Sequence, residues 1–395
     1  MTRGFSDTGL VQLRQAMHAH VDSGNVPGLV ALVARGDEVH EITAGRMALG
    51  GPPMRRDAIF RLASMTKPIT ATAAMILVDE GILGLDDPVD RHLPELANRE
   101  VLKSVDAPLT ETAPATRPIT LRDLLTMRFG LGAIMIWPPR YPIQHAQAAA
   151  GIAPGWTMFD GPQDELIRAV ASLPLAHQPG EGWLYHTGMD VAGVLVARAA
   201  GTSFGAFCKE RIFDPLGMQD TGFYVPPSKT ERLPRIYRGD GKGGLTIAGD
   251  LGGGDGSRPP GAELGGGNIV STADDYLAFC RMLLGSGTYR GIRILSPESV
   301  AEMTRDQLTP AQRDSAPLFF GGHSSWGLGM AVSIRRDNVW NVPGRFGWDG
   351  GYGTSAYSDP EHGLIGILLT QRLMESPEPP GHFTDFWTGA YAALA

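Results

Sequence analysis

An almost wholly apolar run occupies residues 69–78, and two threonines are its only polar side chains. A pattern without a polar face predicts a helix that is buried on nearly all sides. Pro68 helps to fix where this helix begins, because proline is tolerated in a first turn but clashes with a carbonyl further in. Gly81 suits the position after the last turn. We therefore expect Ser64 to lie at or beside the N-terminus of a buried helix.

Short apolar segments of strand length gather near both ends of the chain. Two of them, residues 28–34 and 38–44, flank Arg35-Gly36-Asp37, which predicts a tight hairpin. A short extended piece around Ile59-Phe60 leads into the serine helix. Towards the C-terminus the pattern predicts four more strands, at residues 326–334, 345–348, 353–359 and 364–370.

Apolar residues at helical spacing predict helices through most of the remaining chain. The predicted helices are residues 9–24, 120–126, 164–172, 189–200, 204–213, 271–284 and 383–394. The natural assembly pairs the N-terminal hairpin with the C-terminal strands in one antiparallel sheet. The first helix, the serine helix and the last helix would then cover that sheet.

These elements predict an α+β fold of two domains. Residues 1–85 and 262–395 would form a discontinuous α/β domain that carries Ser64, Lys67 and the strand around Trp348. Residues 86–261 would form a mostly helical cap domain with pocket-lining loops. Ligand sites commonly lie between domains, so a cleft between these two would have the start of the serine helix at its floor.

Two irregular stretches interrupt the helical region. Residues 130–162 carry several aromatic residues with little periodicity, which is typical of loops that wall a pocket: Trp137, Tyr141, Trp156 and Phe159. Residues 237–263 are rich in glycine and indicate a long surface loop. This loop is not a phosphate cradle, because no strand precedes it and no Gly-Lys-Ser/Thr ends it.

The composition is that of a globular chain. Of the 395 residues, 43% are hydrophobic and 19% are charged, which excludes a disordered chain. The 34 basic and 42 acidic residues leave a net charge of −8. This charge argues against nucleic acid or an anionic membrane as a partner, since both reward a basic face.

Cysteine and histidine usage does not indicate a metal or a disulfide framework. Cys208 and Cys280 lie far apart without Cys-x-x-Cys spacing, so we expect two buried thiols. No His-Glu-x-x-His is present, and we expect neither a metal nor a cofactor. The N-terminal residues lack the apolar core of a signal peptide and no later run reaches membrane-spanning length, so we expect a cytoplasmic protein.

Ser64 and Lys67 form the one Ser-x-x-Lys in the chain. Side chains three residues apart share a helix face. A serine hydroxyl is a poor nucleophile until a base takes its proton, and a lysine can do so when burial lowers its pKa. The alternative is a purely structural role, in which Ser64 caps the helix and Lys67 is a solvated first-turn residue. The apolar helix that follows favours the buried, catalytic pair.

Arg61-Leu-Ala-Ser-Met-Thr-Lys-Pro-Ile-Thr70 resembles the active-site helix of the serine β-lactamase and penicillin-binding-protein superfamily, in particular class C β-lactamases and family VIII carboxylesterases. Further similar motifs follow in the same order: Gly84-Leu-Asp-Asp-Pro-Val89, Ile119-Thr-Leu-Arg-Asp-Leu-Leu-Thr126, Pro179-Gly-Glu-Gly-Trp-Leu-Tyr185, Gly265-Gly-Gly-Asn-Ile-Val-Ser-Thr272 and Gly347-Trp-Asp-Gly-Gly351. Together they span about residues 25 to 370, so the resemblance implies a β-lactamase/transpeptidase-like fold for nearly the whole chain.

The resemblance also implies a catalytic tyrosine. The family's Tyr-x-Asn falls at Tyr185-His186-Thr187, where the tyrosine is kept and the asparagine is not. Tyr185 would act as general base or acid beside Ser64 and Lys67. His186 stays unassigned, because a neighbour on an extended segment points away from whatever Tyr185 faces.

The family's third motif, usually Lys-Thr-Gly in β-lactamases, is here Trp348-Asp349-Gly350. The cation that would pair with a β-lactam carboxylate is therefore lost, and Trp348 offers an apolar wall that suits an ester. Backbone N–H groups of Ser64 and Gly351 would form the oxyanion hole. The predicted substrate-binding residues are Trp348, Asp349, Gly350 and Tyr352.

A second serine motif, Gly201-Thr-Ser203-Phe-Gly205, matches the nucleophile elbow of α/β-hydrolases. That elbow needs a strand before the serine, whereas here a helical run precedes it. We therefore expect Ser203 to be a helix cap.

The sequence thus predicts a cofactor-free serine hydrolase that cleaves short-chain carboxylic esters through an acyl-enzyme. The alternatives on the same residues are a β-lactamase, a D-amino-acid peptidase or amidase, and an acyltransferase. A penicillin-sensing module that is acylated without turnover is the alternative outside the enzymes. Acyl preference, enantioselectivity and oligomeric state are left open.

Overall fold

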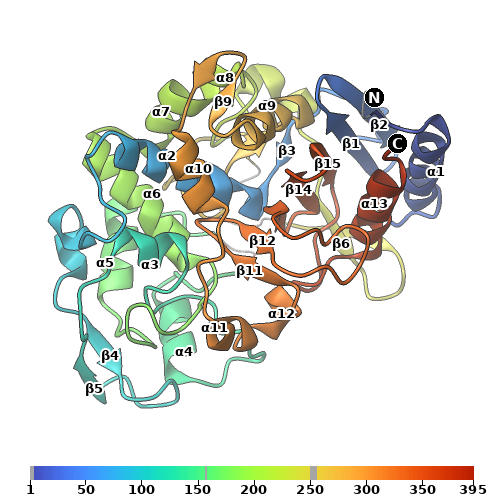
Figure 1. The fold of residues 1–395 in the computed structure, drawn as a ribbon. Coiled ribbons are helices and arrows are strands. Elements are labelled where there is room, and N and C mark those ends of the chain that lie inside the picture. Colours follow the sequence, from blue (N-terminus) through green and yellow to red (C-terminus); the bar gives the residue numbers. More distant parts are fainter. Residues whose placement is uncertain (1–3, 156–157, 250–255) are drawn as a thin grey trace.

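The predicted strands from the two ends of the chain form one seven-stranded antiparallel sheet in the order β11-β12-β13-β14-β15-β1-β2 (Figure 1). The computed structural model describes residues 4–155, 158–249 and 256–395. The strands are β1 (Gly28–Arg35), β2 (Glu38–Gly45), β11 (Ser324–Trp326), β12 (Ala331–Ser333), β13 (Phe346–Gly350), β14 (Thr354–Asp359) and β15 (Leu364–Thr370). The predicted pairing of the two chain ends is confirmed.

The predicted strand at residues 326–334 is wrong, because the segment folds back on itself as the hairpin of β11 and β12. The turn contains Gly329, whose φ is +74°. A Cβ atom on Gly329 would lie 2.6 Å from the Cβ of Ala71 and 2.8 Å from the carbonyl oxygen of Lys67. The turn is therefore pressed against the serine helix, and only glycine gives both the backbone angle and the space.

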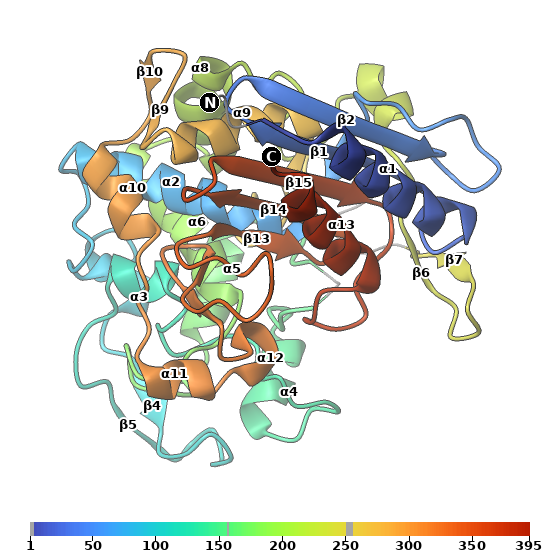
Figure 2. The same cartoon turned by 45° about the vertical axis from the view of Figure 1, so that its right-hand side comes forward.

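Helices cover both faces of the sheet, and they include the three helices that were predicted to cover it. On one face α1 (Asp7–Asp22) and α13 (Gly381–Ala392) lie together over the strands (Figure 2). On the other face lie the serine helix α2 (Thr66–Asp79) and α9 (Ala273–Leu284). Every residue of α2 from Thr66 to Leu77 is buried. The apolar run of the sequence therefore forms a central helix, and Gly81 follows it with a φ of +71°.

The middle of the chain is mostly helical. Its helices are α3 (Leu121–Leu125), α4 (Pro142–Ala149), α5 (Gln163–Ala171), α6 (Thr187–Ala200), α7 (Phe204–Cys208) and α8 (Asp214–Leu216). Where the structure describes the predicted loop at residues 130–162, it contains one helix, α4, which begins at Pro142. Trp156 lies outside the described residues.

Short strands and helices complete the architecture. The strands are β3 (Phe60–Arg61), β4 (Glu100–Leu102), β5 (Thr112–Pro114), β6 (Tyr237–Gly239), β7 (Leu245–Ile247), β8 (Val270–Ser271), β9 (Thr288–Tyr289) and β10 (Ile292–Arg293). The helices are α10 (Pro297–Met303), α11 (Pro310–Asp314) and α12 (Pro317–Phe320). The predicted glycine-rich loop includes the β6–β7 hairpin, and its residues 250–255 lie outside the described part of the chain.

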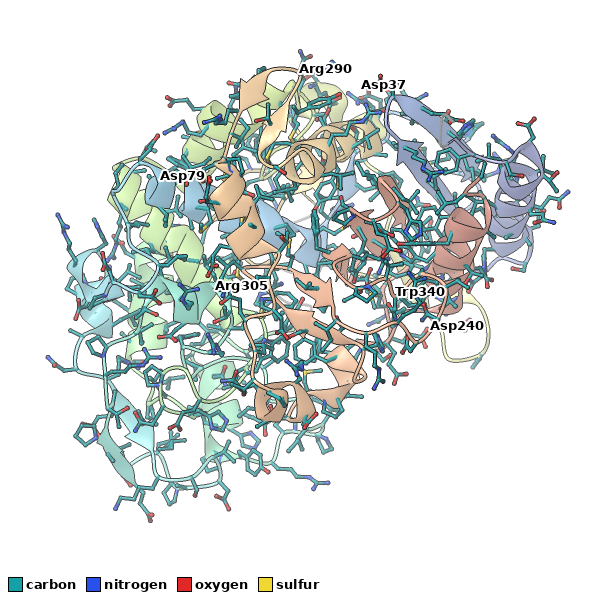
Figure 3. The ribbon with its side chains drawn as sticks, viewed as in Figure 1. Asp37, Asp79, Asp240, Arg290, Arg305 and Trp340 are labelled. Carbon is teal, nitrogen blue, oxygen red and sulfur yellow. The ribbon has the colours of Figure 1, made fainter. Side chains whose placement is uncertain are left out.

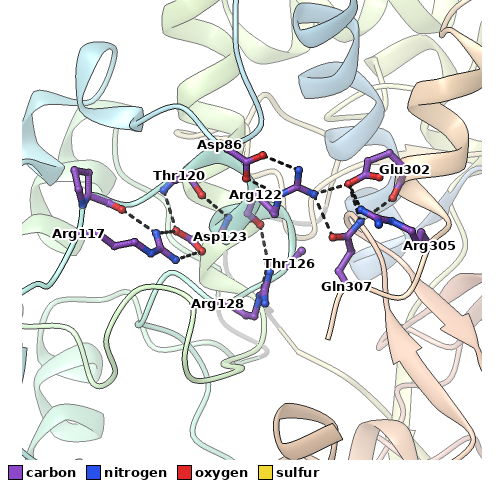
Figure 4. Close-up of polar contacts among 11 residues, drawn as sticks. Asp86, Arg117, Thr120, Arg122, Asp123, Thr126, Arg128, Glu302, Arg305 and Gln307 are labelled. Atoms are coloured by element: carbon purple, nitrogen blue, oxygen red, sulfur yellow. Dashed lines mark hydrogen bonds and ion pairs between the residues drawn. The ribbon is translucent and has the colours of Figure 1, made fainter. Parts of the chain in front are cut away.

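Polar contacts connect the helical region to the remainder. Arg122 of α3 donates to Asp86 at 2.7 and 2.9 Å and to Glu302 of α10 at 2.5 Å (Figure 4). Asp79, at the end of α2 in Figure 3, accepts hydrogen bonds from the backbone and hydroxyl of Ser296 at 2.7 and 2.8 Å. One hydrophobic cluster also extends through both regions. The boundaries of the two predicted domains stay a prediction.

Both cysteine side chains lie inside the protein. Cys208 and Cys280 are free and buried, as predicted.

Among the described residues, no single helix is long and apolar enough to cross a membrane. Only α6 taken together with residues Phe204–Leu216 reaches that length and composition, with a bend of 79° between the two.

Candidate active site

Ser64 lies in a 3₁₀ turn, Ala63–Met65, that leads directly into α2. Ala63 has a φ of +47°, an uncommon value for a residue with a side chain. Two side-chain hydroxyls anchor the turn: Thr354 donates to the carbonyl of Leu62 at 3.0 Å, and Tyr276 donates to the carbonyl of Met65 at 2.9 Å. Ser64 therefore stands at a fixed place beside the start of the helix, as predicted.

The Lys67 amine is fully buried and makes three polar contacts. Its Nζ lies 2.8 Å from Ser64 Oγ, 2.7 Å from the carbonyl oxygen of Gly266 and 3.3 Å from His186 Nδ1. Burial lowers the pKa of Lys67 to about 7, although the carboxylate of Asp190 opposes the shift. A neutral amine is thus accessible near pH 7, at hydrogen-bond distance from the serine hydroxyl.

The phenol of Tyr185 lies against the same pair. Its ring centroid is 4.5 Å from Lys67 Nζ, and its oxygen accepts a 2.6 Å hydrogen bond from the indole Nε1 of Trp348. Burial raises the pKa of Tyr185 well above its usual value, and hydrogen bonds with Ser64 and Trp348 oppose that rise. The phenol is therefore protonated at neutral pH and is available as a proton donor.

The expectation that His186 points away from the site is wrong. His186 has a φ of +86° and a ψ of −67°, so the chain around it is not extended. Its ring faces Lys67 and also reaches Asp190 of α6, with Nε2 3.2 Å from Oδ2. Sequence reasoning missed Asp190 as well. The signal was the four-residue spacing of His186 and Asp190, which becomes visible once a helix is known to begin at Thr187.

The residues of the third motif divide between the two faces of β13. Trp348 contacts Tyr185, whereas Asp349 accepts a 3.3 Å hydrogen bond from Tyr357, whose ring packs edge-on against Trp387 of α13. Burial raises the pKa of Asp349 to about 6. Gly350 packs against the turn before Ser64, because a Cβ there would lie 2.1 Å from the carbonyl oxygen of Leu62. Glycine at this position lets the strand approach the serine.

Several of these groups line one pocket of about 1100 Å³. Its lining includes most of the predicted site: Ser64, Tyr185, Trp348, Asp349, Gly351 and Tyr352. Burial raises the pKa of the Tyr352 phenol to about 12. Trp137, from the predicted pocket-walling loop, also lines the pocket and keeps 86% of its surface exposed. Apolar side chains from the same loop and from α12 add to the wall: Ile134, Ile136, Leu318 and Phe319.

Ser203 lies elsewhere and caps a helix, as predicted. It is the residue before α7, and its Oγ accepts a hydrogen bond from the backbone N–H of Ala206 at 3.1 Å. Among the described residues, clusters of three or more His, Cys, Asp or Glu side chains with metal-site geometry are absent. The site itself brings a serine hydroxyl within hydrogen-bond distance of the buried Lys67 amine, and that amine lies over the ring of Tyr185.

A family model described as Beta-lactamase matches residues 13–384. The chain belongs to the beta-lactamase family. The resemblance of the Ser64 helix and the motifs that follow it to the β-lactamase and penicillin-binding-protein superfamily is thereby confirmed, together with the predicted fold class.

Relatives of this beta-lactamase family member cover most of its length. Protein Rv1367c of Mycobacterium tuberculosis is 39% identical over 387 residues, which are 95% of this chain and 90% of the relative. Esterase EstB of Burkholderia gladioli is 32% identical over 375 residues, or 89% of this chain and 88% of the relative. The solved structure of EstCE1, a hydrolase with promiscuous acyltransferase activity, shares the fold with a TM-score of 0.80 at 24% identity, covering 98% and 99% of the two chains.

Proposed function

We propose that the protein is a serine esterase that works through an acyl-enzyme, with Ser64, Lys67 and Tyr185 as its catalytic residues. The observation that carries this proposal is the buried Lys67 amine, 2.8 Å from Ser64 Oγ and with a pKa of about 7. The kinship with esterase EstB supports the choice of ester as substrate.

In the acylation step Ser64 Oγ attacks the ester carbonyl carbon, and its proton moves to the Lys67 amine as the new C–O bond forms. Backbone N–H groups of Ser64 and Gly351 hold the oxyanion. When the bond to the alcohol breaks, Tyr185 gives its proton to the leaving oxygen and regains one from the Lys67 ammonium. Water then attacks the acyl carbon, returns a proton to Ser64 Oγ and releases the carboxylic acid.

The wall beside Tyr185 favours esters over β-lactams. Trp348 stands at the position where many β-lactamases carry a lysine. Its indole has no positive charge, so it cannot form an ion pair with a carboxylate. Pockets for small molecules commonly span about 300–1000 Å³. At about 1100 Å³ this pocket has room for a bulky alcohol portion as well as a short acyl group. The short acyl chain stays a prediction.

Turnover on two substrate classes tests this proposal. We expect steady-state hydrolysis of p-nitrophenyl acetate and butyrate, with a much lower kcat/KM on a chromogenic cephalosporin. A higher kcat/KM on the cephalosporin would overturn the interpretation of Trp348. A stoichiometric burst without steady-state turnover on either substrate would indicate a binding module. Faster ester consumption with added alcohol, giving the exchanged ester, would indicate an acyltransferase.

Trp348→Phe is expected to lower kcat about 10- to 100-fold with little change in KM. Phenylalanine keeps the apolar wall but removes the N–H that donates to Tyr185, and a hydrogen bond to a group that becomes charged contributes about 1.5–3 kcal/mol. The matched control is Trp326→Phe, which removes an indole N–H whose acceptor is the backbone carbonyl of Leu125. Equal losses of kcat in the two variants would show that the contact with Tyr185 has no catalytic role.

A further inference from the structure

The ring of His186 bridges a buried carboxylate and the buried lysine. Nε2 lies 3.2 Å from Asp190 Oδ2, and Nδ1 lies 3.3 Å from Lys67 Nζ. The side chains of His186 and Asp190 are only 15% and 10% exposed. The other carboxylate oxygen of Asp190 accepts a 2.7 Å hydrogen bond from the backbone N–H of Gly266. A continuous polar chain therefore runs from Asp190 through His186 and Lys67 to Ser64.

A strained backbone conformation holds His186 in this place. The N–H of Thr187 lies 3.3 Å from the carbonyl oxygen of Tyr185, which closes a γ-turn centred on His186. With a φ of +86° and a ψ of −67°, the turn is of the rare, strained kind. Strained backbone of this kind is typical of functional sites. Its effect is that two consecutive side chains, Tyr185 and His186, both face Lys67.

The residues next to His186 leave room for its imidazole ring. A Cβ atom on Gly266 would lie 2.9 Å from Nε2 of His186, so glycine is needed beside the ring. The hydroxyl of Thr187, where the family motif has asparagine, is buried without a hydrogen-bond partner among the described residues. Between His186 and Thr187, it is therefore His186, the residue directly after Tyr185, whose side chain makes the polar contact with Lys67.

The contacts of Asp190 determine which ring nitrogen carries the proton. An ionised carboxylate only accepts hydrogen bonds, so Nε2 must be the protonated nitrogen, and Nδ1 keeps its lone pair facing Lys67. A neutral Lys67 amine has two N–H groups and one lone pair. With the N–H groups directed to the Gly266 carbonyl and to Nδ1, the lone pair is left for the proton of Ser64.

We propose that His186 is a positioning residue that, held in the Nε2–H tautomer by Asp190, orients the Lys67 lone pair towards Ser64. This inference rests on the proposed function. Among the described residues, the titratable groups in contact with His186 are Lys67 on α2, Asp190 on α6 and the adjacent Tyr185. The charge of Asp349 on β13 acts in turn on Tyr185. A proton on Nδ1 would claim the Lys67 lone pair and take it away from Ser64. Activity should therefore fall at acidic pH as Lys67 is protonated, because the ammonium has no lone pair for the proton of Ser64.

Two substitutions of His186 test this role. His186→Ala is expected to lower kcat/KM about 10- to 100-fold, since the lost acceptor faces a group that becomes charged. The midpoint of the acidic limb of the pH–rate profile should move to lower pH, because the Lys67 ammonium loses an acceptor that stabilises it more than the amine. His186→Asn should restore most of the activity and the midpoint, because its amide oxygen can take the place of Nδ1 and asparagine tolerates a positive φ.

The matched control is His362→Ala, which removes another histidine paired with an aspartate, with Nδ1 2.6 Å from Asp359 Oδ2 outside the pocket. This variant should leave the pH–rate profile unchanged. Thermal unfolding of each variant separates loss of fold from loss of position. Equal losses in His186→Ala and His186→Asn, or an unmoved acidic limb in His186→Ala, would overturn the proposal.

A measurement on the unaltered protein decides the tautomer directly. In ¹⁵N-histidine-labelled protein at pH 8, we expect the His186 ring, assigned by comparison with His186→Asn, to show a proton on Nε2 and none on Nδ1. A proton on Nδ1 would contradict the proposal. Failure of these tests while Ser64→Ala is inactive would remove only the role of His186. Full activity of Ser64→Ala would instead remove the proposed function itself.

Discussion

Ser64→Ala is expected to lower kcat/KM for p-nitrophenyl butyrate by at least about 10⁴-fold, because loss of the nucleophile removes the covalent pathway and leaves only binding and oxyanion stabilisation. Ser64 Oγ is 2.8 Å from the amine that would take its proton, and alanine has no oxygen to replace it. The change is small and lies at the floor of an open pocket, so the fold should persist. Steady-state kinetics and a thermal unfolding curve measure the two effects separately.

The matched control for this substitution is Ser203→Ala. Ser203 belongs to the other serine motif but caps α7, where its side chain accepts from the backbone of Ala206. Loss of such a cap costs about 1 kcal/mol of stability. We therefore expect a slightly lower unfolding temperature with unchanged kcat/KM. Esterase activity that survives in Ser64→Ala and disappears in Ser203→Ala would contradict the assignment of the nucleophile.

Lys67→Met is expected to lower kcat about 10³- to 10⁴-fold while the protein stays folded. Methionine has a similar length and no proton acceptor of useful basicity, so Ser64 loses its base. In the unaltered protein, kcat/KM should rise with pH through a midpoint near 7, where the buried amine loses its proton. A residual activity of Lys67→Met that kept this acidic limb at the same midpoint would show that another group titrates there.

The same lysine has a signature in stability. Its pKa is about 7 in the folded protein and near the ordinary value of 10.5 in the unfolded chain. Between these values the unfolded chain binds the proton and the folded protein does not, so the contribution of Lys67 to stability rises with pH through this window. The difference in unfolding free energy between the unaltered protein and Lys67→Met, measured by denaturant titration from pH 7 to 10, should therefore grow in favour of the unaltered protein. A constant difference would mean that burial does not lower the pKa of Lys67.

The elements that the sequence predicted well are those whose pattern is local. The apolar run before Gly81 and the hairpin around Gly36 follow from hydrophobic spacing and turn chemistry alone. The break between β11 and β12 does not, because Gly329 is required by its contact with α2 and not by its own neighbours. Helix α4 was likewise not predicted, because it follows a stretch rich in prolines, although Pro142 is a good first residue for a helix.

The residues of the candidate site also divide into those that local sequence predicted and those that only the fold brings together. Ser64 and Lys67 lie three residues apart, so their meeting followed from helix geometry. Trp348 and Tyr185 are 163 positions apart, and only the assembled fold brings the indole to the phenol. The prediction for His186 is wrong because the backbone makes a γ-turn at this residue and is not extended. A strained turn is set by tertiary packing, so the local sequence carries little sign of it.

Covalent labelling tests the central claim most directly. The protein would be incubated with a p-nitrophenyl phosphonate, its intact mass measured, and the modified peptide mapped. The proposed mechanism predicts one phosphonyl group per chain, located on Ser64, and none in Ser64→Ala. A phosphonyl group on another residue, or stoichiometric labelling that persists in Ser64→Ala, would contradict it.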